Sequence, residues 1–231
     1  MKSSEETLES PRTTVRRMPK RGAYDCATIE SILDEGLICH LGFAVEGQPY
    51  VLPTIYARVG GEVFLHGSAA SRMARALGDG IAMCLTVTLL DGLVLARSAF
   101  HHSVNYRSVI LYGQAEEVRD AAEKHEALRR VVEHVAQGRW KDVREPNLEE
   151  FQKTLVLRVP IAEGSAKIRS DGVIDDAEDL ALGCWAGLVP IETRFGTPVP
   201  DPQLPRGVEL PAYLAPYRRP GPHSGADGLK R

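Results

Sequence analysis

Apolar and polar residues alternate along much of residues 37–118, and this alternation predicts a mainly β fold. Strands are expected at 37–45, 50–59, 62–66, 81–89, 93–98, 106–118, 154–161 and 165–170. Glycine-containing turns separate them at Glu46–Pro49, at Gly60-Gly61 and at Asp91-Gly92, and the last dipeptide favours a hairpin. Strands that recur about every 10 residues are typical of a barrel or a sandwich.

Three other segments have the spacing of helices. Asp25 is a candidate N-cap for a short helix that ends at Gly36. Residues 71–78 can form a second short helix, and Asp120 starts a longer helix whose apolar residues recur at helical intervals. The helices are therefore expected at the periphery of the β structure.

The two ends of the chain differ in composition from its middle. Residues 1–20 are polar and contain two prolines, so we expect a flexible N-terminal arm. Residues 21–195 form the predicted barrel domain, and residues 196–231 form a proline-rich C-terminal extension. Proline excludes a regular helix or a central strand from this tail, which still has enough apolar residues to pack over the body or a partner subunit.

Composition limits the classes of function. A net charge of -3 and a hydrophobic share of 43% fit a globular protein and give no support for nucleic-acid binding. The basic run from Arg12 to Arg21 is short, and we interpret it as a solvated arm rather than a polyanion site. No segment approaches the ~18 consecutive apolar residues of a membrane span. The N-terminus has no apolar secretory segment, so the expected location is the cytoplasm.

Cysteine and histidine do not predict a metal site. The four cysteines have no CxxC spacing, which also argues against a disulfide scaffold. His101 and His102 are adjacent, so on a strand they point to opposite faces and cannot share one ion.

A polar cluster lies where a strand leads into a helix. His66-Gly67-Ser68 ends the strand, and Ser71 and Arg72 follow at the helix start. Hydroxyls, helix-start amides and a guanidinium can together hold a phosphate. The simpler alternative is an ordinary helix cap with a surface arginine.

Further candidate groups occur downstream. Arg107 and Ser108 open an apolar strand, where the alternative is a polar strand end facing solvent. Lys167 lies on a later strand, and Trp185 could cover a planar aromatic ring or could be a core or interface residue. Two such polar strand ends on one sheet suggest a phosphate-bearing cofactor.

From about Arg21 to Pro190 the chain resembles the flavin-nucleotide-binding branch of the pyridoxamine 5'-phosphate oxidase-like split barrels, which includes nitroimidazole-resistance proteins. The resemblance rests on Tyr24-Asp25, Gln48-Pro49-Tyr50-Val51-Leu52-Pro53, Leu65-His66-Gly67-Ser68, Asp91-Gly92, His102-Ser103-Val104-Asn105-Tyr106-Arg107-Ser108, Gly138-Arg139-Trp140, Ser165-Ala166-Lys167-Ile168-Arg169 and Trp185-Ala186-Gly187-Leu188-Val189-Pro190.

This resemblance implies a six-stranded split barrel that forms a homodimer, with one FMN in each of two grooves between the subunits. The segment Pro53-Thr54-Ile55 would line the isoalloxazine ring, and the cluster from His66 to Arg72 would hold the ring edge, ribityl chain and phosphate. Arg107 and Ser108 would reach the same site, and Lys167 and Trp185 would approach from the partner. The implied cofactor-binding set is Pro53, Thr54, Ile55, His66, Gly67, Ser68, Ser71, Arg72, Arg107, Ser108, Lys167 and Trp185.

The leading hypothesis from the resemblance is an FMN-dependent reductase of small oxidised aromatic or nitro compounds, with an unidentified electron donor. His66 is the candidate catalytic residue because a neutral imidazole could hydrogen-bond the flavin or donate a proton. The alternatives are a protein that binds FMN, haem or a deazaflavin without turnover, including a redox sensor, and a plain structural dimer. The C-terminal substrate-phosphate residues of the true oxidase are missing after Val189, which argues against pyridoxamine phosphate as substrate.

Overall fold

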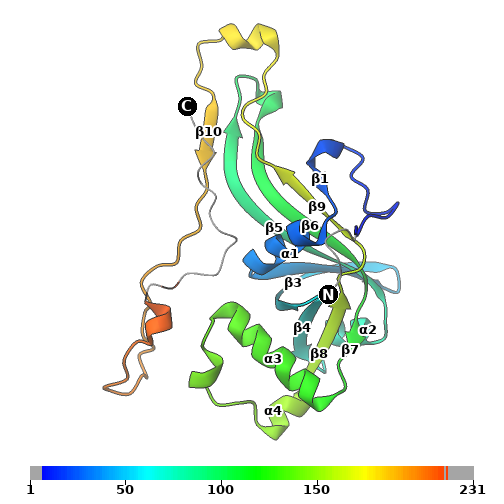
Figure 1. Cartoon of the computed structure of the whole chain (residues 1–231), viewed down its shortest axis with the longest axis vertical. Helices are drawn as coiled ribbons and strands as arrows, with labels where there is room; N and C mark the ends of the chain where they lie inside the picture. The colour runs from blue at the N-terminus through cyan, green and yellow to red at the C-terminus, as the bar shows by residue number, and fades with distance from the viewer. Residues whose placement is uncertain (1–6, 216, 218–231) are drawn as a thin grey trace.

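Six long antiparallel strands form a barrel in the computed structural model, which describes residues 7–215 and 217 (Figure 1). In their order across the sheet they are β6 (Ser103–Gln114), β5 (Ala82–Leu95), β2 (Ile38–Val45), β3 (Gln48–Val59), β4 (Glu62–Ser68) and β8 (Thr154–Pro160). The short β7 (Glu116–Glu117) continues the line of β6 and pairs with β8, which closes the barrel. The predicted fold class, a mainly β barrel with peripheral helices, is confirmed.

Local sequence explains the boundaries of these elements. Glu46 and Gly47 have φ values of 51° and 78°, the left-handed conformation that a tight β2–β3 hairpin requires. Side chains cap three helices at their predicted starts: Asp25 accepts from Thr28 N at 2.8 Å, Ser71 from Ala74 N at 3.1 Å, and Asp120 from Glu123 N at 2.8 Å. These helices are α1 (Cys26–Glu35), α2 (Arg72–Gly78) and α3 (Ala121–Val135).

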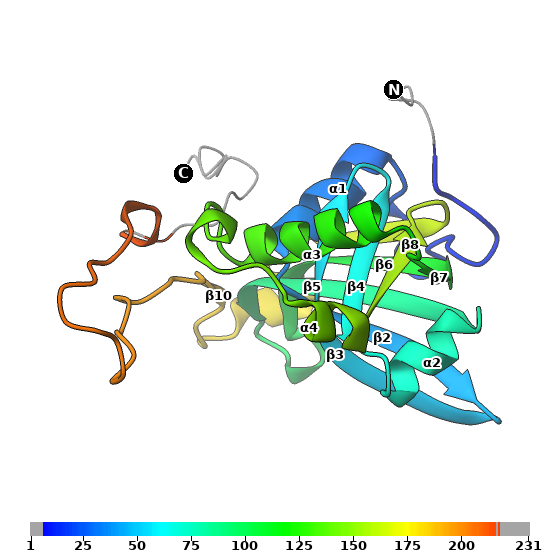
Figure 2. The ribbon, with the colours of Figure 1, turned by 90° about the horizontal axis from the view of Figure 1, so that it is seen from below.

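Two apolar clusters hold the helices on the barrel. The main core fills the barrel and includes Ile29, Ile32 and Leu33 of α1, each at most 1% exposed. A smaller cluster joins Phe64 of β4 to Ala127 of α3, so α3 lies across the outside of β3, β4 and β8 (Figure 2). The capped helix α4 (Leu148–Lys153) leads directly into β8.

The prediction of a hairpin at Asp91-Gly92 is wrong. β5 runs through this dipeptide as one strand, and a β-bulge between Leu90 and Gly92 takes up the irregularity. Gly92 is not part of a turn; it allows the neighbouring strand to approach β5 closely, because a Cβ there would lie 3.1 Å from the carbonyl oxygen of Val189. β5 and β6 therefore form a long curved pair that extends beyond the barrel (Figure 1).

Shorter strands extend the sheet on either side of this pair. β9 (Gly164–Arg169) pairs with β6, and β1 (Gly22–Ala23) pairs with β9. β10 (Gly187–Pro190), which the sequence did not predict, pairs with the outer end of β5. The described residues also form five 3-10 helices, at Pro19–Arg21, Ala99–His101, Trp140–Asp142, Ala177–Ala181 and Ala212–Leu214.

No helix in the described part of the chain combines the length and apolar character needed to cross a bilayer.

Candidate functional site

The barrel splits between β3 and β4. The ladder between these strands covers Tyr56–Val59 of β3 and stops at the pair Tyr56 and Leu65. Beyond that point, residues 48–55 of β3 pair with β2, whereas residues 66–68 of β4 pair with β8. Within residues 7–215, no strand pairs with the other edge of residues 48–55. Backbone amides and carbonyls along such an edge can bind a planar polar ligand.

The predicted ring-binding segment and the first polar cluster lie on the two sides of this split. Thr54 and Ile55 belong to β3, and His66 and Gly67 follow Leu65 on β4. A Cβ on Gly67 would lie 3.2 Å from Cε of Met73, so glycine lets α2 approach the end of β4 closely. The structure therefore brings Pro53, Thr54 and Ile55 to the same split as His66, Gly67 and Ser68.

A hydroxyl-rich turn connects β4 to α2 at the end of the split. Ser71 N donates to the carbonyl of Ser68 at 2.9 Å, and Ala70 N donates to Ser68 Oγ at 3.3 Å. Ser71 Oγ also caps α2, so the simpler alternative of a helix cap is realised here. The backbone of Arg72 begins α2, but its side chain lies outside the described part of the structure.

His66 has one ring nitrogen that nothing satisfies. Its Nδ1 is buried and has no hydrogen-bond partner among the described residues. Burial lowers the pKa of His66, so the imidazole is neutral at pH 7. Buried polar atoms in native proteins are nearly always hydrogen-bonded, so this nitrogen marks a place for a ligand or a water molecule.

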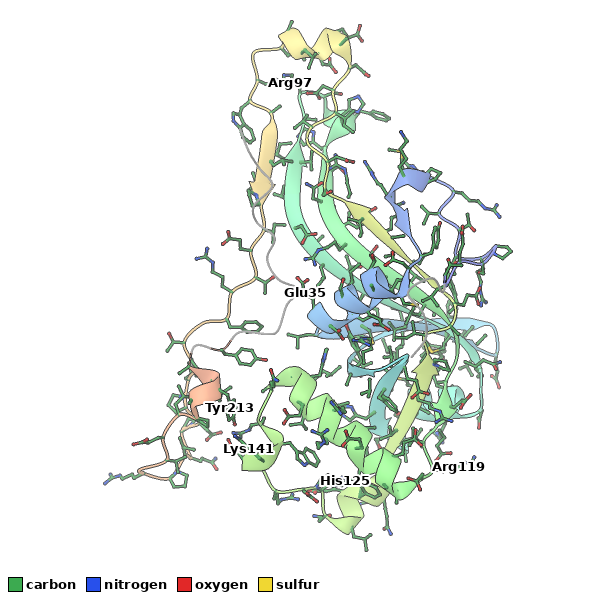
Figure 3. All side chains as sticks on the ribbon, viewed as in Figure 1. Glu35, Arg97, Arg119, His125, Lys141 and Tyr213 are labelled. Carbon is green, nitrogen blue, oxygen red and sulfur yellow. The ribbon has the colours of Figure 1, made fainter. Side chains whose placement is uncertain are left out.

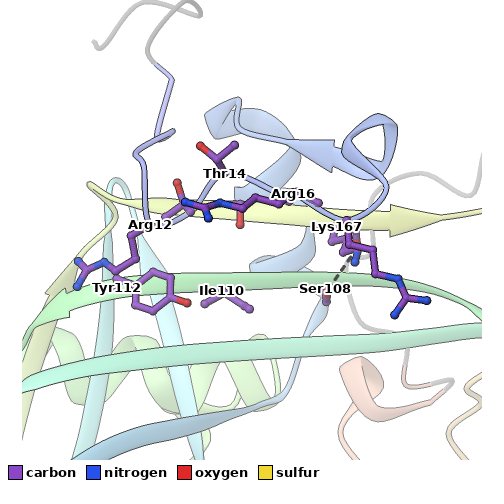
Figure 4. Close-up of a pocket in the computed structure, with 11 residues that line it drawn as sticks. Arg12, Thr14, Arg16, Ser108, Ile110, Tyr112 and Lys167 are labelled. Atoms are coloured by element: carbon purple, nitrogen blue, oxygen red, sulfur yellow. Dashed lines mark hydrogen bonds between the residues drawn. The ribbon is translucent and has the colours of Figure 1, made fainter.

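Ser108 and Lys167 lie elsewhere on the sheet of the same subunit. They are directly paired on β6 and β9, and Ser108 Oγ donates to the carbonyl of Lys167 at 3.3 Å (Figure 4). Sheet order places β6 three strands from β3, which is roughly 14 Å at ~4.8 Å per strand. Together with the N-terminal arm, these two residues line a pocket on the outer face.

Arg107 points to the opposite side of β6 from Ser108. Its guanidinium donates to Glu35 of α1 at 2.8 Å and to Asp91 of β5 at 2.8 Å. Hydrogen bonds to these two carboxylates raise the pKa of Arg107. The structure thus assigns this arginine a structural contact network, and its role toward a cofactor stays a prediction.

Trp185 is also distant from the split within one subunit. It lies two residues before β10, which pairs with Gly92–Leu95 at the outer end of β5. Its side chain is 66% exposed and packs beside Gly187, where a Cβ would lie 2.7 Å from the indole ring. An exposed tryptophan on a projecting segment is available to a partner molecule.

The sequence analysis missed the basic residues of the N-terminal arm. Arg12, Arg16 and Arg17 line the outer-face pocket beside Lys167 (Figure 4). Leu8, only 3% exposed, anchors this arm in the main core. An apolar residue ahead of a basic run was the one sequence signal that the run would lie on the barrel.

Comparisons with known proteins agree with this architecture. A family profile described as pyridoxamine 5'-phosphate oxidase matches residues 25–168. A search of curated protein sequences gave no match.

Three solved structures illustrate the similarity. The flavocytochrome Anf3 from Azotobacter vinelandii is 41% identical, with a TM-score of 0.86 and coverage of 92% of this chain and 99% of that chain. The FAD and haem binding protein from Mycobacterium smegmatis is 32% identical, with a TM-score of 0.81 and coverage of 85% and 96%. A candidate 5-nitroimidazole antibiotic resistance protein from Bacteroides thetaiotaomicron is 23% identical, with a TM-score of 0.55 and coverage of 74% and 90%, and shares the fold.

Proposed function

This chain belongs to the pyridoxamine 5'-phosphate oxidase family, and from that premise we propose that it is a flavin-binding redox protein with its flavin in the split between β3 and β4. One observation carries the proposal: the unpaired edge of residues 48–55 faces the polar end of β4. A flavin ring presents alternating donors and acceptors along its edge, which a bare strand edge can match. The bound flavin would supply the redox chemistry, and the chain supplies placement.

The described residues fit distinct parts of such a ligand. Backbone groups of Pro53–Ile55 would bind the ring, and His66 would offer its unsatisfied Nδ1. Ser68 and Ser71 would offer hydroxyls to the ribityl chain or phosphate, and Arg72 starts the helix beside them. Because the His66 imidazole is neutral, it can act as a hydrogen-bond donor or acceptor without adding charge.

We further propose that two subunits build each site. The sheet face that carries Ser108 is rich in exposed apolar side chains, including Ile38 at 50%, Val51 at 67% and Leu90 at 52% exposure. Several exposed apolar side chains on one face of a sheet are typical of an interface. A second copy placed against it would bring its Ser108, Lys167 and Trp185 toward the split of the first.

The finer proposal is an FMN-dependent reductase of small oxidised aromatic or nitro compounds. Its support is the fold shared with the candidate nitroimidazole-resistance protein and the position of His66 as a possible proton donor at the split. The electron donor and the substrate are open.

A second candidate is a protein that holds haem as well as flavin. The two relatives above 30% identity are named for haem-containing proteins, a flavocytochrome and an FAD and haem binding protein. A neutral imidazole has the donor chemistry that a haem iron accepts, and burial keeps His66 neutral. This second candidate also favours FAD over FMN as the flavin, because one of these relatives is named for FAD.

The visible spectrum of the purified full chain, followed by extraction and identification of the cofactor, tests these proposals. Flavin bands alone support the reductase, and flavin bands with a Soret band support the second candidate. A screen of both nicotinamides as reductants then tests turnover. If the chain purifies without colour and binds neither riboflavin, FMN nor FAD on reconstitution, the proposed function is wrong.

A further inference from the structure

The outer-face pocket is built by an N-terminal arm that is firmly attached to the barrel. Leu8 N donates to the carbonyl of Tyr24 at 3.0 Å, and Gly164 N donates to the carbonyl of Leu8 at 3.0 Å. Farther along the arm, Val15 N donates to the hydroxyl of Tyr24 at 2.7 Å. Residues 12–17 are thereby held over β6 and β9.

Four basic residues line this pocket, and one of them forms an ion pair with a carboxylate. Arg12 donates through Nε to Glu163 at 3.1 Å and stacks over the Tyr112 ring at 4.6 Å. Arg16, Arg17 and Lys167 have no side-chain hydrogen bond or ion pair to any described residue. Three positive charges without a partner among the described residues therefore line one pocket, in a chain whose net charge is -3.

Hydroxyl groups complete the lining, and none of the lining residues is acidic. Ser165 is 8% exposed and pairs with Ile110, next to the pair of Ser108 and Lys167. The Ser108 hydroxyl makes only a 3.3 Å bond to a carbonyl, so it can rotate toward a better acceptor. A pocket lined by cations and hydroxyls without carboxylates attracts an oxyanion and repels cations.

A phosphate has more oxygens than a single carboxylate, so two guanidinium groups and an ammonium group can bind it at the same time. The pocket is a local recess, whereas nucleic-acid sites present extended basic stripes. We propose that the pocket under the N-terminal arm is a binding site for the phosphate or diphosphate group of a nucleotide, held by Arg16, Arg17 and Lys167.

Two sources could supply this group. One is the adenylate-side phosphate of an FAD that reaches over from the partner subunit, since the phosphate next to the ribityl chain is assigned to the turn from Ser68 to Arg72, and this source rests on the proposed function. The other is a free nucleotide or phosphate ester, which does not. The shared chemistry is a phosphate oxyanion on the outer face of β6 and β9.

The test compares three variants of the full chain, as purified and after cofactor extraction: Arg16→Ala with Arg17→Ala, Lys167→Gln, and Lys20→Ala as control. Lys20 is an exposed cation of the same arm that does not line the pocket. Titration calorimetry with pyrophosphate, followed by FAD, FMN and riboflavin, measures binding, and thermal unfolding confirms that each variant folds.

The double variant and Lys167→Gln should each weaken pyrophosphate binding about tenfold or more, while Lys20→Ala changes it little. Added salt should weaken binding in the unmodified chain. Equal pyrophosphate affinity in all four proteins, or none in the unmodified chain, overturns the site.

The flavin titrations separate the sources. Weaker FAD binding with unchanged FMN and riboflavin binding identifies the adenylate-side phosphate of FAD, and unchanged binding of all three flavins with weaker pyrophosphate binding identifies a free ligand. If the unmodified chain binds no flavin, the proposed function fails, and the pyrophosphate result still decides the phosphate site.

Discussion

Arg107 on β6 and Glu35 at the end of α1 form a two-pronged ion pair, in which Nη2 donates to Oε1 at 2.8 Å and Nη1 donates to Oε2. Asp91 accepts from the same guanidinium, with Nε donating to Oδ2 at 3.0 Å. One side chain therefore joins a helix end, the bulge of β5 and the start of β6. The Asp91-Gly92 dipeptide is held in an extended strand partly by this contact.

Arg107→Ala should destabilise the fold and leave flavin binding nearly unchanged. The substitution leaves Glu35 and Asp91 close together without their shared cation, so the free energy of unfolding should fall by about 2 kcal/mol. Urea denaturation and flavin titration measure the two effects. Arg119→Ala is the control: the Arg119 side chain is 83% exposed and pairs with Glu117, so its loss should lower the free energy of unfolding little. Lost flavin affinity at normal stability would instead place Arg107 in the cofactor site.

His66 should make stability depend on pH below neutrality. Burial lowers the pKa of the folded-state imidazole below its usual value of 6.5. Above that pH neither state binds the proton, so His66 contributes no pH dependence there. As the pH falls below about 6.5, the unfolded chain takes up a proton that the folded chain resists, and stability drops by at most ~1.4 kcal/mol per pH unit.

Denaturant unfolding of the chain and of His66→Gln at several pH values between about 5 and 8 checks this window. The variant should lose part of the slope below pH ~6.5. His102→Gln, on an exposed histidine that bonds the carbonyl of Ser98, is the matched control and should keep the slope. An identical slope in all three proteins would contradict the burial of His66.

Val51→Glu should turn a dimer into a monomer. Val51 is the most exposed of the apolar residues on the β2–β3 part of the sheet face, at 67%, and an interface over this face would bury it. A specific interface buries at least about 1,000 Å², and an unpaired carboxylate at its centre is costly. Light scattering at micromolar concentration gives the mass. Leu148→Glu, on an α4 residue that is 72% exposed, is the control. A monomer before substitution would refute the homodimer.

Periodicity predicted the strands and helices because their determinants are local, whereas the split barrel was implied by the family resemblance. Alternating apolar and polar residues predicted the strands. Asp25, Ser71 and Asp120 cap helices at positions where a short polar residue precedes an apolar repeat. The hairpin prediction at Asp91-Gly92 was wrong because this dipeptide is compatible with a hairpin or with a bulge. Which of the two forms depends on Arg107 and on the close approach of β10. Those partners are distant in sequence, so no local pattern contains them.

The candidate site was predictable in part for the same reason. His66, Gly67 and Ser68 are consecutive in sequence, so they are also neighbours in the fold. They lie across the split between β3 and β4 from Thr54 and Ile55. Ser108 and Lys167 meet through strand pairing, yet they lie across the sheet from that split. The basic arm was interpreted as solvated because charge alone does not reveal the anchor that Leu8 provides.

Deletion of the residues after Pro198 should leave the flavin spectrum in place. The described tail leaves β10 and returns beside the end of α3, where Tyr213 packs on Gly138 and accepts from Arg139 Nη1 at 3.3 Å (Figure 3). None of these contacts reaches the split, so the deletion should lower the free energy of unfolding by roughly 1 kcal/mol. Tyr213→Ala should reproduce much of that loss. A folded deletion variant without cofactor would show that the tail belongs to the site.

Arg72→Ala should weaken FMN binding by roughly ten- to a hundredfold, because a charge-assisted bond to phosphate contributes about 1.5–3 kcal/mol. Riboflavin lacks the phosphate and should be affected much less. Arg75→Ala is the matched control: Arg75 lies on the same helix, its side chain is exposed, and its loss removes an equal charge. Titrating both flavins into the extracted chain and the two variants gives the affinities, and thermal unfolding confirms the fold. Equal losses for FMN and riboflavin would place Arg72 away from the phosphate. Equal losses in the two variants would reduce the effect to long-range charge, which added salt would screen.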